Sequence, residues 1–349
     1  MNRRLPVYLL LDCSESMAGE AFDAVVSGIG TLAGELRRDP QALETACMSV
    51  ITFSSVARQV MPLTDLMSFR LPRLRLGSGT ALGGALMLWQ QCMARDVVKT
   101  SATQKGDYKP VCFIMTDGEP TDAWEVAADQ VRTCVAGKKA NVIAVACGQD
   151  AVLAKLRRIT ETVLLMKGTN AGAFAQFFKW VSASVSTASQ KLEQGGAHGL
   201  GLPNPPEGVE IASAAAGPLS RGAADRQVFL HTRCMKTKGF YLIRYVRNSE
   251  GQGRAESGAS PVYRAAAAHK VEDFESDAEG ESPRLKVSNE NLVGSPACPY
   301  CGNGIWGMCP KGHVHCCPEY SGSVTLTCPW FGITCSYSQN RFDVGRGVG

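Results

Sequence analysis

The chain has 349 residues, of which 45% are hydrophobic and 19% are charged. This length favours about two domains, and the composition is that of a globular chain, which excludes a mostly disordered or fibrous protein. The formal net charge of +4 is too small an excess over this length to indicate a nucleic acid or an anionic membrane as a partner.

The fourteen cysteines are unevenly distributed. Seven lie between Cys298 and Cys335. The others are scattered singly, mostly in apolar surroundings where a reduced cysteine packs as a small hydrophobe: Cys13, Cys47, Cys92, Cys112, Cys134, Cys147 and Cys234. This distribution indicates a reducing compartment and one metal cluster.

The amino-terminal segment resembles a signal peptide only superficially. Its apolar run, residues 5–11, is at the short limit for such a segment and ends at Asp12 without a small-residue cleavage site. The chain also has no uncharged apolar stretch of about 18 residues, the length needed to span a bilayer. We therefore expect a cytoplasmic protein with no membrane partner.

Residues 5–190 alternate apolar, strand-like runs with helical patterns. We predict strands over 6–11, 46–53, 111–116 and 141–146, and helices over 19–38, 81–94, 123–136, 151–159 and 171–192. This alternation is typical of a parallel sheet covered by helices on both faces. Residues 1–192 are thus predicted to form an α/β domain, a doubly wound, Rossmann-like parallel sheet.

The rest of the chain divides by composition. Residues 193–226 are rich in Gly, Pro and Ala and are predicted to be a linker without regular structure. Residues 227–297 are predicted to be β-rich, with strands over 227–233 and 240–246 joined by a turn at 236–239, and with an acidic, solvated loop over 272–283. Residues 298–349 hold the cysteine cluster and are predicted to form a small zinc-binding domain.

Three oxygen-rich loops are predicted to reach one edge of the parallel sheet. Asp12, Ser14 and Ser16 follow the first strand, Thr80 precedes a helix, and Asp117 follows the strand at 111–116. Because open α/β sheets bind ligands at the carboxyl ends of their strands, we expect these side chains to converge. Their oxygens suit Mg²⁺ or Mn²⁺, whereas Zn²⁺ prefers nitrogen and sulfur. Helix capping explains each residue singly, but it does not explain why the three loops coincide.

The pattern Asp-x-Ser-x-Ser with a distant Thr and a distant Asp resembles the metal-ion-dependent adhesion site of von Willebrand factor A domains. The resemblance covers residues 5–190 and implies that Asp12, Ser14, Ser16, Thr80 and Asp117 hold the metal. It also implies a module that binds an Asp or Glu of a partner protein through that metal.

Further acidic residues lie near these loops in the sequence, and they could tune the choice of partner. We favour the simpler interpretation that they are solvated: Glu15, Glu20, Glu119 and Asp122.

The carboxy-terminal cluster contains ligands typical of zinc. Cys298-Pro-Tyr-Cys301 is a metal knuckle, and the full candidate set is Cys298, Cys301, Cys309, His313, His315, Cys316, Cys328 and Cys335. Cys317 is left out because adjacent cysteines point apart. The set suffices for one or two structural zinc ions, which would stabilise a region too small for a good core of its own. A disulfide-linked tail, a redox Cys-x-x-Cys and a cross-braced RING are weaker interpretations, the last because Phe331 stands where a RING would place sulfur.

An A domain followed by such a tail resembles the TerY family of tellurium-resistance proteins. Beyond the cysteines, the resemblance depends on the segments 228–234, 239–245 and 288–292. It implies a partnership with a protein kinase and a 2C-type protein phosphatase, in bacterial stress-response or phage-defence systems.

These observations favour a non-enzymatic scaffold with two modules. A metal-dependent phosphoryl-transfer enzyme is the first alternative, but no phosphate-binding loop, nucleophile elbow or His-Glu-x-x-His pair is present. Nucleic-acid binding is the second alternative, since basic and aromatic residues alternate in two predicted strands. Half-buried strands show the same pattern for packing reasons, so this alternation does not favour nucleic acid as a partner. The basic and aromatic residues concerned are Phe229, Arg233, Lys236, Lys238, Phe240, Tyr241, Arg244, Tyr245 and Arg247.

Overall fold

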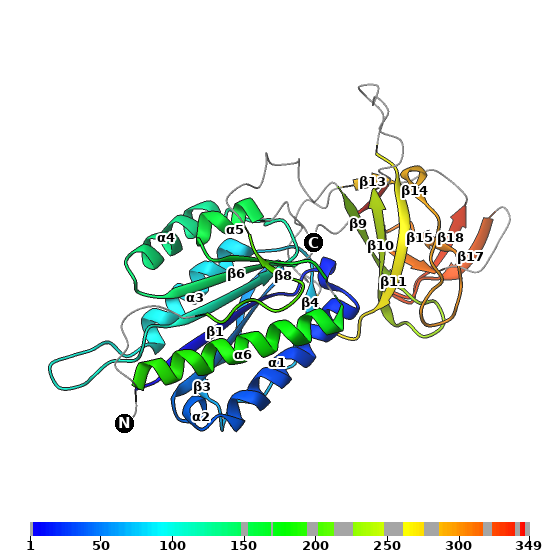
Figure 1. Ribbon diagram of the computed structural model, residues 1–349. Coiled ribbons are helices and arrows are strands. Elements are labelled where there is room, and N and C mark those ends of the chain that lie inside the picture. The colour runs from blue at the N-terminus through cyan, green and yellow to red at the C-terminus, as the bar shows by residue number, and fades with distance from the viewer. Residues whose placement is uncertain are drawn as a thin grey trace. The chain divides into compact units, whose positions relative to one another are not determined.

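The computed structural model describes residues 3–147, 153–168, 170–193, 202–212, 226–247, 261–275, 286–316, 323–338 and 343–345. The chain forms two compact units (Figure 1). The first comprises residues 1–74 and 80–220, and the second comprises residues 75–79 and 221–349.

The first unit is built on a seven-stranded sheet with the order β3-β2-β1-β5-β6-β7-β8. Its strands are β1 (Leu5–Asp12), β2 (Ala46–Phe53), β3 (Ala57–Asp65), β5 (Val111–Thr116), β6 (Asn141–Cys147), β7 (Val163–Met166) and β8 (Val209–Ile211). The five strands from β2 to β7 in this order are parallel, while β3 and β8 pair antiparallel at the two edges. The predicted doubly wound sheet is confirmed. Its order changes direction between β1 and β5, which is the position where such sheets bind ligands.

Helices cover both faces of this sheet (Figure 1). They are α1 (Glu20–Arg38), α2 (Pro40–Thr45), α3 (Leu82–Asp96), α4 (Glu125–Ala136), α5 (Leu153–Ile159) and α6 (Ala171–Glu193), with a 3-10 turn η1 (Glu15–Met17) before α1. On one face α1 and α2 pack against α6, and on the other α4 packs between α3 and α5. The predicted helices agree with these bounds to within two residues, except that α2 was not predicted.

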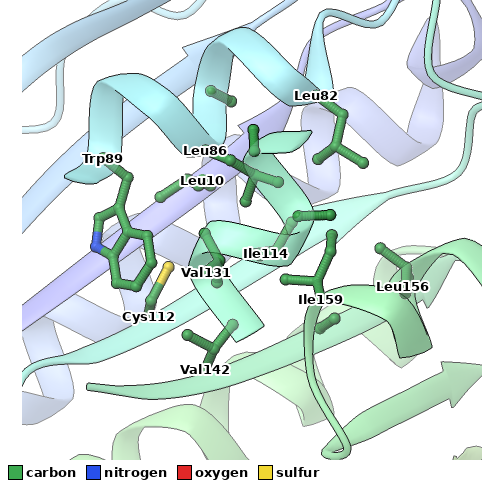
Figure 2. Close-up of a cluster of buried hydrophobic side chains, with 14 of the residues drawn as sticks. Leu10, Leu82, Leu86, Trp89, Cys112, Ile114, Val131, Val142, Leu156 and Ile159 are labelled. Atoms are coloured by element: carbon green, nitrogen blue, oxygen red, sulfur yellow. The ribbon is translucent and has the colours of Figure 1, made fainter. Parts of the chain in front are cut away.

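The core on the second of these faces contains side chains from the five parallel strands and from α3, α4 and α5 (Figure 2). Leu10 of β1, Ile114 of β5 and Val142 of β6 are among its members. On the opposite face Phe113 packs edge-on against Trp180 of α6, with ring centroids 6.4 Å apart. Successive residues of a strand point to opposite faces, and helices cover both faces of this sheet. The central strands are therefore buried on both sides and appear in the sequence as continuous apolar runs.

Three strands of this sheet were not predicted from the sequence: β3, β7 and β8. β3 has only half-buried and exposed residues, in no regular alternation, and β7 has only four residues. β8 lies within the predicted linker, where Val209–Ile211 pairs with β7. β3 and β8 are edge strands, which are hydrogen-bonded on one side only and need little apolar surface, and β7 is too short to show a periodic pattern.

The second unit contains a six-stranded sheet with the order β14-β11-β10-β9-β16-β15. Its strands are β9 (Gln227–Arg233), β10 (Phe240–Arg247), β11 (Tyr263–Lys270), β14 (Leu292–Val293), β15 (Trp306–Met308) and β16 (Val314–Cys316). Three strand pairs complete the unit: β4 (Leu76–Gly77) with β12 (Phe274–Glu275), β13 (Lys286–Ser288) with β19 (Asp343–Gly345), and β17 (Ser323–Thr327) with β18 (Thr334–Ser338).

Residues 227–297 and 298–349, which were predicted to be separate, belong to one unit in the structure. β9 from the first segment pairs in parallel with β16 from the second. This pairing connects residues about eighty positions apart, and a local pattern carries no information on it. The β-rich segment and the cysteine cluster therefore form one unit.

Parts of the predicted linker and of the acidic loop lie outside the described residues, and so does Cys317. Among the helices of the described chain, none is both long and apolar enough to cross a bilayer.

Candidate metal centres

The strand order of the first unit brings the predicted oxygen ligands to one end of the sheet. Asp12 is the last residue of β1, and Asp117 directly follows β5, the parallel neighbour of β1. Ser14 is the N-cap residue of η1, Ser16 lies within η1, and Thr80 lies two residues before α3. All of them thus follow strands or precede helices at the carboxyl end of the sheet, as predicted.

A chain of hydrogen bonds shows that four of these residues converge. Ser16 Oγ donates to Asp117 Oδ1 at 2.6 Å, and the hydroxyl oxygens of Ser14 and Ser16 are 2.9 Å apart. The Ser14 amide donates to Asp12 Oδ1 at 2.9 Å, and Thr116 Oγ1 donates to Asp12 Oδ2 at 2.5 Å. These contacts place hydroxyl and carboxylate oxygens from both loops in one small region.

Thr80 completes the oxygen set in a different way. Its side chain is fully buried, and its Oγ1 has no hydrogen-bond partner among the described residues. A buried hydroxyl without a partner costs roughly 1–3 kcal/mol. A cation bound beside Thr80 would take this oxygen as a ligand and remove that cost. The donor set of two carboxylates and three hydroxyls therefore fits Mg²⁺ or Mn²⁺.

The electrostatics of the site also favour a cation. Asp12 is 2% exposed, and its burial, together with the nearby charge of Asp117, raises the pKa of Asp12 to about 7. Two carboxylates so close together destabilise each other when both are ionised. A divalent cation would offset this repulsion.

Three of the four nearby acidic residues are buried or have protein partners rather than being simply solvated, which corrects the prediction. Glu15 is fully buried, Glu119 forms an ion pair with Lys155, and Asp122 accepts hydrogen bonds from the backbone at the start of α3. Only Glu20 is exposed as expected. Sequence patterns missed these roles because each partner comes from a different element.

The second unit brings four cysteines together, one of which was not predicted. The sulfur atoms of Cys234, Cys298, Cys301 and Cys316 all lie within 4.8 Å of one another. Four thiolates at this spacing are the ligand set of a structural zinc site. Cys234 directly follows β9 and Cys316 ends β16, so the parallel pairing of these strands brings the two cysteines to the same end of the sheet.

Two turns of similar geometry hold these cysteines. In the predicted knuckle, Gly302 N donates to Cys298 O at 2.8 Å, and Gly302 has a φ of 77°. In the second turn, Lys238 N donates to Cys234 O at 2.9 Å, and Lys238 has a φ of 62°. Cys234 thus begins a knuckle whose second cysteine is replaced by Thr237. The sequence signal that could have found it is the turn predicted at 236–239, which begins just after a cysteine.

Backbone amides around this cluster are arranged to stabilise thiolates. The amides of Met235 and Thr237 donate to the sulfurs of Cys316 and Cys234, at 3.2 and 3.5 Å. Burial opposes ionisation of Cys234, but the hydrogen bonds from Thr237 and the neighbouring amides lower the pKa of Cys234 to about 6. Burial raises the pKa of Cys298. A bound cation would favour the thiolate form of all four residues.

Four of the other predicted zinc ligands lie outside this group, in a second part of the unit. Cys309 and Cys328 are buried in one apolar cluster, with Cys335 packed against it. Cys309 Sγ lies 3.5 Å from His313 Nδ1. Gly332, which has a positive φ, lies four residues after Cys328, as Gly302 does after Cys298, whereas Gly312, also with a positive φ, lies three residues after Cys309.

His315 is placed differently from the sequence prediction. It is fully buried on β16, where Nε2 lies 2.7 Å from Tyr337 Oη and Nδ1 lies 3.1 Å from the carbonyl oxygen of Cys316. Both ring nitrogens are therefore engaged in hydrogen bonds. Because successive residues of a strand point to opposite faces, His315 and Cys316 cannot serve the same ion. The described residues thus assign Cys234, rather than His315, to the group that contains Cys316.

Two protein-family models match the chain. The model of the von Willebrand factor type A domain matches residues 7–179, and the model of the TerY-C metal binding domain matches residues 225–349. Both matches agree with the resemblances found in the sequence. Among curated proteins, none matches the chain.

Several solved structures are similar to part of the chain. Proximal thread matrix protein 1 from the mussel byssus has 16% identity and a TM-score of 0.40, over 53% of this chain and 48% of that protein. Another structure of that protein, with a zinc-occupied metal-ion-dependent adhesion site (MIDAS) motif, has 17% identity and a TM-score of 0.36, over 54% and 46% of the two chains. The pilus adhesin SpaC from Lactobacillus rhamnosus GG has 12% identity and a TM-score of 0.42, over 54% and 31%. The chain therefore spans about half the length of the byssus protein, 48%, and less of the adhesin.

Proposed function

Since the chain is a von Willebrand factor type A protein that carries a TerY-C metal-binding domain, we propose that it is a non-catalytic, metal-dependent scaffold for protein–protein interactions. The first unit would hold Mg²⁺ or Mn²⁺ and bind an Asp or Glu side chain of a partner protein. The observation that carries this proposal is the converging oxygen set, including the buried Thr80 hydroxyl that has no hydrogen-bond partner among the described residues.

The composition of the oxygen set explains why a partner carboxylate is the expected ligand. Three of the proposed ligands, Ser14, Ser16 and Thr80, are neutral hydroxyls, so Asp12 and Asp117 alone balance the charge of a divalent ion. An ion held in this way retains its attraction for a further anion. An acidic side chain of another protein satisfies that requirement without a large apolar pocket.

In the second unit we propose a structural zinc ion bound by Cys234, Cys298, Cys301 and Cys316. Four protein ligands close the coordination of such an ion and leave no position for a substrate. The remaining cluster supplies three cysteines and one histidine, which are also typical zinc ligands, for a second zinc ion: Cys309, His313, Cys328 and Cys335. The zinc-bound unit would then offer a second contact surface.

The resemblance to the TerY family leads us to propose a protein kinase and a 2C-type protein phosphatase as partners, in a bacterial tellurium-resistance, stress-response or phage-defence system. Two modules on one chain could hold an enzyme near its substrate and raise its effective concentration.

The contacts of individual residues favour this proposal over the alternatives. Phosphoryl transfer would need a cationic group or a general base near the metal, and the nearby Lys155 is already paired with Glu119. Nucleic-acid binding would need exposed aromatic rings, whereas Tyr241 and Tyr245 are buried in the core of the second unit. Phe240, on the same strand, stacks on Phe274.

A quantitative pull-down from the native lysate tests the proposed function. The bait proteins are the wild type, the double variant Asp12→Ala/Ser14→Ala, and Glu20→Ala as a control that removes an exposed acid near the site. All three are first shown to hold equal zinc, so that any difference comes from the first unit. We expect the double variant to lose a defined partner that the wild type and Glu20→Ala recover only with Mg²⁺ present.

Identical recovery by all three proteins would contradict metal-dependent recruitment by the first unit. Turnover of a phosphopeptide by the wild type that is lost in Asp12→Ala would instead support the enzymatic alternative. Identification of the lost protein by mass spectrometry would decide between a kinase, a phosphatase and another client.

A further inference from the structure

The segment after Asp117 is fastened to the loop that carries Thr80. The Thr80 amide donates to Thr121 Oγ1 at 2.9 Å, and the Thr121 amide donates to the Thr80 carbonyl oxygen at 2.9 Å. Thr80 is therefore fixed through its main chain, while no described residue hydrogen-bonds with its hydroxyl. The two reciprocal bonds connect the second and third loops of the metal site directly.

Asp122 extends this connection to α3. Ala81 occupies the N-cap position of α3 and offers no side-chain acceptor. Asp122 provides the missing cap: its Oδ1 accepts from Gly83 N at 3.1 Å, and its Oδ2 accepts from Gly84 N at 2.8 Å. A carboxylate at this position pairs two free amides and interacts favourably with the helix dipole. The helix start that follows Thr80 is thus held by a residue from the loop of Asp117.

Gly83 is what allows this close approach. A Cβ atom at position 83 would lie 2.7 Å from Trp124 Cα and 2.9 Å from the Ala123 carbonyl oxygen, both of which are backbone atoms. At the next position, a Cβ on Gly84 would meet its nearest neighbours at 3.7 and 3.8 Å, which is ordinary contact. The two adjacent glycines therefore differ sharply in what they tolerate, and they form a matched pair for an experiment.

The segment is also fixed on the side of Asp117. Gly118 N donates to Thr116 Oγ1 at 3.2 Å, and Thr116 Oγ1 in turn donates to Asp12 Oδ2. The carboxylate of Glu119 pairs with Lys155 of α5. Residues 117–122 are thus held at both ends, with Asp117 at one end and the contacts to Thr80 and α3 at the other.

We propose that Thr121 and Asp122 are positioning residues for the metal of the first unit. Neither is a ligand, but together they fix Thr80 relative to Asp117, so that the oxygen set is formed before the ion binds. The inference rests on the proposed function, because it concerns the affinity of the same site for its ion. Residues that orient metal ligands through hydrogen bonds typically change metal affinity by about 10- to 100-fold when they are replaced.

A titration of zinc-loaded full-length protein with Mn²⁺, followed by electron paramagnetic resonance, tests the proposal. Asp12→Ala gives the background from other sites. We expect Asp122→Ala and Thr121→Val to bind Mn²⁺ about tenfold more weakly than the wild type, or weaker still. Thr121→Ser keeps the acceptor oxygen and should restore the affinity. Thermal unfolding without Mn²⁺ and the zinc content show whether each variant is folded.

The glycine pair gives an independent arm that leaves every hydrogen-bonding side chain in place. Gly83→Ala should weaken Mn²⁺ binding by displacing residues 122–124 from α3, while Gly84→Ala should bind Mn²⁺ like the wild type. If Gly83→Ala fails to fold, the comparison of Thr121→Val with Thr121→Ser still tests the proposal.

The outcomes separate this inference from the proposed function. In one outcome, the wild type binds Mn²⁺ above the Asp12→Ala background, and folded Asp122→Ala and Thr121→Val bind it with unchanged affinity. This result would overturn the positioning role and leave the metal site intact. Equal losses of Mn²⁺ affinity in Thr121→Val and Thr121→Ser would also overturn it, because the hydroxyl oxygen that serine retains would then make no difference. No wild-type binding above background would overturn the metal site itself and this inference with it.

Discussion

The two candidate metal centres relate to their surroundings in opposite ways. In the first unit, the oxygen ligands lie at one end of a sheet whose core is filled by other residues, such as Leu10, Trp89 and Ile114 (Figure 2). In the second unit, three of the four clustered cysteines, Cys234, Cys298 and Cys316, belong to the apolar core itself. We infer that the first ion is an accessory to a complete fold, whereas the second is part of the fold.

The largest expected effect is therefore the loss of a cysteine ligand in the second unit. In zinc-finger peptides, the apparent free energy of zinc binding is roughly 10–16 kcal/mol, which is comparable to the whole free energy of unfolding of a typical domain. Cys234→Ser should release zinc and abolish the protection of β9 and β10 against hydrogen exchange, while the strands of the first unit stay protected. The measurements are zinc stoichiometry and hydrogen exchange resolved by peptide.

Cys134→Ser is a suitable control for that experiment. Cys134 is half-buried on α4 and belongs to no cysteine group in the described part of the chain. Its replacement should leave zinc and exchange unchanged. Full zinc occupancy in Cys234→Ser, together with loss in Cys298→Ser, would show that the metal is closed by another ligand.

The effect of the first metal should be smaller and conditional on the ion. At a Mg²⁺ concentration one hundred times the dissociation constant, the wild type should be stabilised by about 2.7 kcal/mol. Asp12→Asn should lose this response. Without Mg²⁺ it should be at least as stable as the wild type, because the repulsion between Asp12 and Asp117 is removed.

Thermal unfolding of zinc-loaded protein with and without Mg²⁺ checks this prediction. Asp129→Asn, which removes an exposed carboxylate paired with Arg158 on the surface, should respond to Mg²⁺ like the wild type. A melting temperature of Asp12→Asn that still rises with Mg²⁺ would place the binding ion elsewhere.

The difference between the two centres also explains how far the sequence could predict them. The ligands of the first site are fixed by topology: each follows a strand or precedes a helix, and the parallel strands are visible as apolar runs such as Val111–Thr116. Once the strands were identified, the convergence of Asp12 and Asp117 followed from the fold class. The positions of five predicted ligands needed no knowledge of side-chain contacts.

The second site depends on pairings that a local pattern does not contain. Cys234 stands alone in the sequence because Thr237 occupies the place of a second cysteine, and only the pairing of β9 with β16 brings Cys234 to Cys316. The role of Asp122 was hidden for the same reason, since its partners Gly83 and Gly84 precede it by 39 and 38 positions. Long-range contacts decide both cases, and spacing alone is silent about them.

The smallest effect concerns the backbone of the unusual knuckle. Lys238 has a φ of 62°, where the corresponding turns of the unit have glycine, as at Gly302 and Gly332. The left-handed conformation costs a residue with a Cβ about 1–2 kcal/mol, so Lys238→Gly should stabilise the second unit by up to about 1 kcal/mol after the greater chain freedom of glycine is subtracted. Lys236→Gly, in the same turn but without positive φ, should instead destabilise it by about 0.5–1 kcal/mol.

Hydrogen exchange of β9 and β10 under native conditions measures both changes at equal zinc content. If Lys238→Gly stabilises the unit and Lys236→Gly destabilises it, the backbone at Lys238 is strained. Such strain is tolerated if the bound metal dominates the stability of this region. Equal destabilisation would contradict the strain at Lys238. It would then follow that the contact of its side chain with the Met235 carbonyl oxygen stabilises the turn more than its φ angle destabilises it.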